Sequence, residues 1–164
     1  MFRLLTVTVA LLASVACSGS STSATSPTNT GGVPVTPLHG TMTASIDGSS
    51  WTAVAINTAT YTKGLLSIGG ADGSNPIRSI ALALTVAGPG TFAMGTLPSA
   101  ANAVLSIGIG PTWTANVGGG SGTITITAIS STGTSGTFFF TAVPAAGGAT
   151  GTHTVTSGTF NITF

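Results

Sequence analysis

Charged side chains are nearly absent from this chain of 164 residues, which contains three Lys and Arg residues, two Asp residues and no Glu. The cations Arg3, Lys63 and Arg78 lie far apart in the sequence, so they form no basic stripe and we expect no nucleic-acid partner. Two isolated carboxylates do not make the acidic cluster that a hard cation needs. The composition therefore gives no reason to assign a cofactor or a metal ion.

Cysteine is just as scarce, because Cys17 is the single one and no disulfide can form within the chain. Scarce charge can accompany disorder, but disordered chains combine low hydrophobicity with high net charge. Here 42% of the residues are hydrophobic and the formal net charge is +1. The sequence therefore predicts a folded domain whose polar surface consists of hydroxyl groups.

The first 16 residues have the pattern of a secretory signal peptide. Arg3 supplies a positive charge, and an apolar run at 4–16 follows it. That run is shorter than the about 20 residues that a permanent membrane helix needs. Small residues, Ser14 and Ala16, stand at the third and first positions before Cys17, as cleavage by a signal peptidase requires.

The tetrapeptide that ends in Cys17 resembles the lipobox of bacterial lipoproteins, in which the cysteine sulfur receives a diacylglyceryl group. That pattern prefers Leu where this chain has Ser14. We expect a lipid anchor at Cys17 that attaches the protein to a membrane. The alternative is a secreted protein without lipid, cut by an ordinary signal peptidase.

Residues 17–39 are rich in Ser, Thr and Gly and contain three Pro, as a flexible spacer does. The residue after the cysteine is Ser18 and not Asp, which resembles lipoproteins sent to the outer membrane or the cell surface of bacteria. The organisation that we predict is a signal peptide at 1–16, a lipidated cysteine with its spacer at 17–39, and a folded domain at 40–164.

Apolar and hydroxyl side chains alternate through the folded domain with the period of two that is typical of β-strands. In residues 41–46 the apolar Met42, Ala44 and Ile46 share one face, and Asp47-Gly48 then gives a strong hairpin signal. Residues 79–86 are apolar on both faces, which predicts a central strand covered on both sides.

The fold that this pattern predicts is all-β, an antiparallel sandwich of about eight to ten short strands. Frequent Gly and Pro turns and short connections favour hairpins. A small closed β-barrel is the alternative, including an outer-membrane barrel, because the chain ends in Phe164 after alternating apolar residues.

The segment before Phe164 predicts a local irregularity. Phe160, Ile162 and Phe164 share one face, but Val155 has the wrong parity to join them. One extra residue must intervene if Val155 also faces inward, so we expect a bulge between residues 156 and 159. Gly158 is the expected site, because Gly accepts the left-handed conformation that a bulge can require.

Four stretches together resemble an uncharacterised domain family of small all-β bacterial lipoproteins. They are ASIDGSSWTA at 44–53, LSIGGADGSNPIRSIALAL at 66–84, GTITITAISSTGTSGTFFFTA at 122–142 and TSGTFNITF at 156–164. The resemblance implies a sandwich-like domain and a lipid anchor. It supplies no activity and no binding residues.

The residue types for catalysis are present but form no recognisable arrangement. His39 lies where spacer meets domain, His153 begins a strand, and Asp47 and Asp72 are explained by turns. General acid–base catalysis needs positioned groups with tuned pKa values, so we expect no enzyme. The alternative of a weak calcium site in the Asp72 loop rests on one carboxylate.

Binding is the more serious functional hypothesis. Tyr61 and Trp113 are candidates for stacking on a glycan, and Trp113 follows Gly110-Pro111 in an expected loop. We expect Trp51, which opens a strand, to plug one end of the core. A structural or adhesive role, with an envelope protein as partner, is the other hypothesis. Self-association is expected as well, because little charge opposes it.

Overall fold

The structure is a computed structural model that describes residues 40–95, 101–116 and 118–164. These residues form eleven β-strands, somewhat more than the eight to ten expected, because short strands pair beside the long ones. The strands are β1 (Gly40–Ile46), β2 (Ser49–Thr52), β3 (Ala55–Thr62), β4 (Leu65–Ala71), β5 (Arg78–Thr85), β6 (Gly90–Met94), β7 (Ala101–Ile107), β8 (Thr112–Thr114), β9 (Ser121–Ile129), β10 (Gly133–Ala146) and β11 (His153–Thr163). Within the described ranges, no helix is long and apolar enough to cross a membrane.

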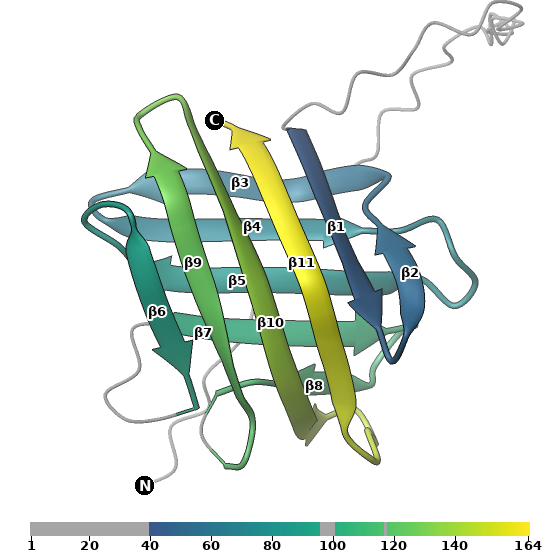
Figure 1. Cartoon of the computed structure of the whole chain (residues 1–164). Coiled ribbons are helices and arrows are strands. Elements are labelled where there is room, and N and C mark those ends of the chain that lie inside the picture. The colour runs from purple at the N-terminus through teal and green to yellow at the C-terminus, as the bar shows by residue number, and fades with distance from the viewer. Residues whose placement is uncertain (1–39, 96–100, 117) are drawn as a thin grey trace, which may run out of the picture. The chain divides into compact units, whose positions relative to one another are not determined.

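The strands form two antiparallel layers that pack face to face (Figure 1). The first layer has the order β2-β1-β11-β10-β9-β6, and the second has the order β3-β4-β5-β7-β8. Strands of the two layers cross steeply, as in orthogonal sandwiches. Because β2, β3 and β6 each have one neighbour, the sheet stays open at its edges. The expected all-β sandwich is confirmed, and the alternative of a sheet closed on itself is wrong.

The long strand β10 belongs to both layers. Its residues 134–141 pair with β9 and β11, whereas Val143 and Pro144 pair with β8 in the second layer. A register shift lies between Pro144 and Ala146. Strands that pass from one sheet to the other make the corners of orthogonal sandwiches. This corner therefore joins the two layers by backbone hydrogen bonds.

The core lies between the layers and follows the alternation that the sequence predicts. Met42, Ala44 and Ile46 of β1 are buried, and Trp51 of β2 is 1% exposed, which confirms its expected place in the core. One expectation is wrong in part, because β5 is central but covered on one face only. Ala81 on its outer face is exposed, and so small a side chain leaves little apolar surface in water.

The first hairpin has the expected turn. Asp47 and Gly48 both have positive φ, 49° and 82°, as a two-residue turn of the type favoured in hairpins requires. A second turn of this kind joins β3 to β4 through Lys63 and Gly64, with φ of 52° and 80°. The hairpin signal that we read at residues 47 and 48 is therefore confirmed.

The predicted bulge in β11 is confirmed, with one correction to its chemistry. Thr43 pairs with Thr159 but Ser45 pairs with Thr156, so one extra residue lies in β11. The left-handed residue is Ser157, with a φ of 52°, and not the expected Gly158. Glycine is needed at 158 for space, because a Cβ there would lie 2.5 Å from the carbonyl oxygen of Phe138.

Replacing Gly158 tests this account. Gly158→Ala places its methyl group against the backbone and ring of Phe138, so we expect a loss of about 2 kcal/mol in the free energy of unfolding. The matched control is Ser157→Gly, which relieves a left-handed serine and should leave stability unchanged or raise it by about 0.5–1 kcal/mol. Urea unfolding measures both. A Gly158→Ala protein as stable as the parent would contradict the packing argument.

Candidate functional site

The predicted signal peptide at 1–16 and spacer at 17–39, with Cys17 and His39, lie outside the described residues. The remaining candidates for a site fall at three places. Trp113, His153 and Asp47 meet at one end of the sandwich, Asp72 holds the β4–β5 loop, and Tyr61 lies on the edge strand β3.

Trp113 does not lie in an exposed loop, so that expectation is wrong. It is the central residue of β8, where it pairs with Leu105 of β7 and Pro144 of β10. The side chain is 6% exposed, and its indole N–H lies 3.2 Å from the carbonyl oxygens of Thr150 and Gly151. A ring buried in this way has no free face for a sugar.

Tyr61 is half-buried, and its ring packs against the core. The hydroxyl donates to the carbonyl oxygen of Val86 at 3.3 Å. Phe164 stacks on the ring with 6.1 Å between centroids. The hydroxyl group and the ring of Tyr61 therefore both make contacts within the protein. A glycan-binding role for Tyr61 stays a prediction.

Asp47 and His153 form a pair that the sequence gave no reason to expect, because 106 positions separate them. One carboxylate oxygen of Asp47 lies 2.5 Å from His153 Nδ1, and the other accepts the backbone N–H of Thr154 at 2.8 Å. The ring of Trp113 meets the imidazole edge-on, with centroids 4.4 Å apart. Among the described residues no serine hydroxyl bonds to this imidazole, so no nucleophile completes the pair.

Burial alone would raise the pKa of the Asp47 carboxyl group. The hydrogen bonds from Thr154 and His153, together with the charge of the imidazole, outweigh burial and lower that pKa. Asp47 is therefore an anionic acceptor that fixes the β1–β2 hairpin to β11. It does not have the raised pKa of a general acid.

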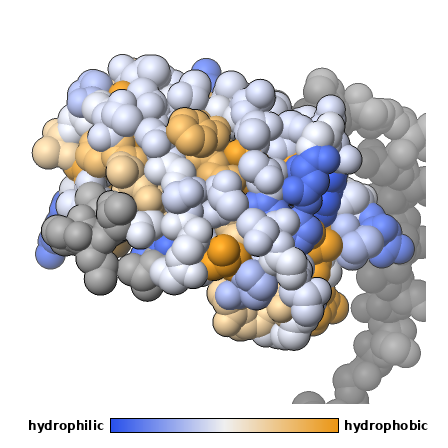
Figure 2. Space-filling model, turned by 60° about the horizontal axis from the view of Figure 1, so that its bottom comes forward, coloured by the Kyte–Doolittle hydropathy of each residue, from blue (hydrophilic) through white to orange (hydrophobic). Residues whose placement is uncertain are grey.

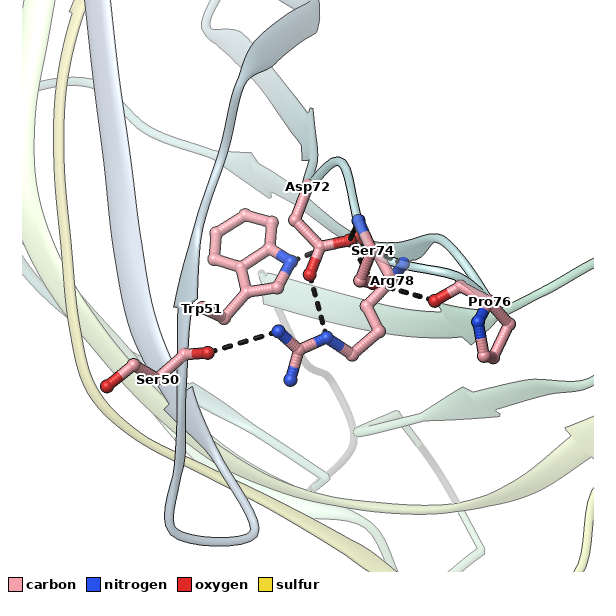
Figure 3. Close-up of polar contacts among 6 residues, drawn as sticks. All are labelled: Ser50, Trp51, Asp72, Ser74, Pro76 and Arg78. Carbon is pink, nitrogen blue, oxygen red and sulfur yellow. Dashed lines mark hydrogen bonds and ion pairs between the residues drawn. The ribbon is translucent and has the colours of Figure 1, made fainter.

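The Asp72 carboxylate is the centre of a second polar cluster, drawn in Figure 3. One oxygen accepts the backbone N–H of Arg78 at 2.8 Å and lies 2.6 Å from the Ser74 hydroxyl. The other oxygen accepts Nε of Arg78 at 2.7 Å. The Ser74 hydroxyl also lies 2.7 Å from the carbonyl oxygen of Pro76. The Asp72 carboxylate, directly and through Ser74, therefore holds the β4–β5 loop in its conformation.

The same cluster reaches across to the first layer. Arg78 Nη2 donates to the carbonyl oxygen of Ser50 at 3.0 Å, and the indole N–H of Trp51 donates to the carbonyl oxygen of Arg78 at 3.0 Å. Both contacts join β2 to the start of β5 (Figure 3). We call residues Asp72, Ser74 and Arg78 the loop clamp.

The loop clamp leaves little for a metal ion. Both oxygens of Asp72 are used within the loop, and no second carboxylate approaches them. In the part of the chain that the structure describes, no three His, Cys, Asp or Glu side chains gather as metal ligands. The calcium site considered for this loop therefore finds no support in its geometry.

A row of six threonines crosses the outer face of the first layer, one from each strand. The register of the strands places Thr91, Thr125, Thr137, Thr159, Thr43 and Thr52 side by side. The hydroxyl oxygens of Thr43 and Thr159 lie 2.8 Å apart, and those of Thr91 and Thr125 lie 3.3 Å apart. We call this row the threonine ladder. Phe139, 55% exposed, lies beside it on β10.

The sequence showed the alternating threonines but not the ladder, because a ladder depends on which strands pair.

Hydroxyl residues also explain the character of the surface. On the face that Figure 2 shows, much of the surface is pale, neither strongly hydrophilic nor strongly hydrophobic, with separate blue and orange patches. Cross-strand threonine pairs stabilise a sheet without charge.

The loop clamp predicts a pH dependence of stability. Burial would raise the pKa of Asp72, but its hydrogen bonds with Ser74 and Arg78 lower it. A carboxyl group with a lowered pKa in the folded state stabilises the fold above its unfolded pKa of about 3.9, and this contribution is lost as the pH falls through the folded value.

We expect Asp72→Asn to reduce the free energy of unfolding by about 1–3 kcal/mol at pH 7. The lower end of this range is favoured because Arg78 is 23% exposed, so water screens the ion pair. The difference from the parent protein should shrink towards pH 2. Urea unfolding across this range measures it, and Asp47→Asn, at a carboxylate that is 47% exposed, should show the same trend with a smaller difference. A difference in unfolding free energy that is the same at pH 7 and near pH 2 would contradict the lowered pKa of Asp72.

No curated protein and no solved structure shows a significant match to the chain. A family model does match, the domain of unknown function DUF6252, over residues 39–162. These residues include all eleven strands but the last residue of β11, Thr163, and they include both polar clusters and the threonine ladder. The resemblance to an uncharacterised domain family is thereby confirmed, and the chain belongs to the family of the domain of unknown function DUF6252.

Proposed function

We propose that the chain is an exported lipoprotein, anchored through Cys17, that displays a non-catalytic β-sandwich for adhesion or binding. One observation carries the non-catalytic part. Both carboxylates of the described residues hold a turn or a loop in place, Asp47 with His153 and Asp72 with Arg78. Acid–base chemistry needs a group that is free to exchange a proton with a substrate, and the two clusters supply none.

The sequence before Cys17 supports the anchor. A charge at Arg3, a short apolar run and small residues at Ser14 and Ala16 fit an exported chain that is cleaved at the cysteine. A lipid at Cys17 also gives a use to the single thiol. The location we propose is the outer membrane or the surface of a bacterial cell.

The intact mass of the mature protein tests the anchor, beside a Cys17→Ser variant. We expect the parent protein to carry the added mass of a diacylglyceryl group and to fractionate with membranes, because the acyl chains insert into the bilayer. The variant should lose the added mass and should no longer stay with membranes that have been washed. An unmodified parent chain that begins at or near Cys17 would make this a free secreted protein and would refute the anchor.

One observation favours a glycan as the ligand of the displayed domain. The threonine ladder presents six hydroxyl groups in a row, with strands about 4.8 Å apart, so the row extends for about 24 Å. Phe139 offers a ring beside it, and the face contains no charged side chain of the described residues. A neutral, extended polysaccharide is the ligand class that fits hydroxyl groups and an aromatic ring without charge.

Phe139→Ala tests the glycan as ligand. We expect the variant to lose at least about tenfold in retention on an insoluble neutral polysaccharide, because the ring supplies the main apolar contact. Leu65→Ala is the matched control, since Leu65 has the same 55% exposure on the other layer. If Phe139→Ala and Leu65→Ala are retained equally, the proposal that a glycan binds on the face with Phe139 and the threonine ladder is contradicted.

A further inference from the structure

Aliphatic side chains protrude from neighbouring loops at one end of the second layer. Ile77, in the β4–β5 loop, is 55% exposed, and Ile109, in the β7–β8 loop, is completely exposed. Val54, between β2 and β3, is 68% exposed and lies against Gly73 of the same β4–β5 loop. Figure 1 shows the β4–β5 and β7–β8 connections at the same end of the sheet. We call these three residues the aliphatic tips.

The loops that carry the tips are joined and held. The backbone N–H of Gly108 donates to the carbonyl oxygen of Ile77 at 2.8 Å, which links the two loops. The loop clamp fixes the neighbours of Ile77 on both sides, through the carbonyl oxygen of Pro76 and the N–H of Arg78. An open cleft of about 450 Å³ lies between the loops. Its lining is Asn75, Pro76, Ile77, Gly108 and Ile109.

The tips do not contribute to the core, so folding does not account for them. Single exposed aliphatic residues are ordinary on protein surfaces, but a group of them on adjacent loop tips marks an interaction surface. We propose that the aliphatic tips insert into the interfacial region of a lipid bilayer and dock this end of the domain on the membrane.

The shape and chemistry of the surface favour lipid over protein. The centres of protein interfaces are enriched in aromatic residues and Arg, packed into complementary surfaces. The tips are branched aliphatics, and the side chain of Ile109 is completely exposed. The nearest charges, Asp72 and Arg78, neutralise each other in the loop clamp, so no exposed carboxylate there opposes contact with lipid.

The chain length also favours the membrane, and here the inference rests on the proposed anchor at Cys17. Between Cys17 and Gly40 the chain has about 23 peptide steps, which span at most roughly 80 Å. A lipid at Cys17 therefore keeps the domain within reach of the bilayer. Weak contacts suffice under such tethering, because the local concentration of lipid is high.

Charge makes the proposal more specific. In the described residues Lys63 and Arg78 balance Asp47 and Asp72, and Lys63 lies at the opposite end of β4 from the tips. Binding must then come from apolar contact and not from attraction to anionic lipid. We expect equal binding to neutral phosphatidylcholine vesicles and to vesicles with phosphatidylglycerol, with little change in high salt.

The test uses the mature chain from residue 17 with Cys17→Ser, which lacks the apolar leader and has no cysteine, and phosphatidylcholine vesicles at millimolar lipid. We expect the added pair Ile77→Ser and Ile109→Ser to lower vesicle co-sedimentation at least about tenfold. Leu65→Ser is the matched control at the other end of the layer and should change little. All variants share the same N-terminal residues, so differences between them report on the loops, and their circular dichroism must be unchanged.

A second measurement places the tips directly. A polarity-sensitive dye on Ile109→Cys should be quenched by nitroxide lipids, and the same dye on Leu65→Cys should not. Equal quenching at both positions, or equal loss in the Ile and Leu variants, overturns the proposal. So does self-association that the Ile77→Ser and Ile109→Ser pair abolishes, because the surface is then a protein interface. The proposed anchor is judged separately, by the mass at Cys17.

Discussion

The pairing of β10 with strands of both layers is the constraint on which the rest of this sandwich depends. Residues 134–141 pair with β9 and β11, and Val143 and Pro144 pair with β8. The chain has no disulfide to hold the layers together, so the apolar core and this shared strand must do so. Trp113 is buried at the corner where β10 leaves the first layer, and its ring contacts His153, which in turn pairs with Asp47. The position of the Asp47–His153 pair is thus a consequence of this corner.

Four of the few ionisable groups of the domain serve its architecture. Asp72 and Arg78 fix the β4–β5 loop and reach the backbone of β2 in the other layer. Asp47 and His153 fix the first hairpin to the start of β11. Hydroxyl groups take over the surface role that charges have in most proteins, and the threonine ladder is the most regular result. Both functions that we propose for the domain belong to neutral surfaces: a hydroxyl face on one layer and aliphatic loop tips beside the other.

The parts of the fold that depend on local pattern could be predicted from the sequence. Alternation gave the inward faces, Asp47-Gly48 gave the first hairpin, and the parity of Val155 against Phe160 gave the bulge in β11. What could not be predicted depends on pairing between distant segments. Three residues in β8 gave too weak a pattern to reveal that Trp113 is buried. The Asp47–His153 pair and the threonine ladder depend on the pairing of strands that lie far apart in the chain. Alternation decides which face a side chain takes, but not which residues of two distant strands lie opposite each other.

The pairing of β1 with β11 has a consequence for how the domain reaches its fold. The hydroxyl contact between Thr43 and Thr159 joins residues 116 positions apart, so the first strand of the domain finds its partner only when the final strand is present. Closing so long a loop is costly in chain entropy, and folds dominated by distant contacts form slowly. A chain under synthesis therefore has no complete first layer until β11 has emerged. Slow, late folding of this kind would suit the export that we propose, in which the chain stays extended until it has crossed a membrane.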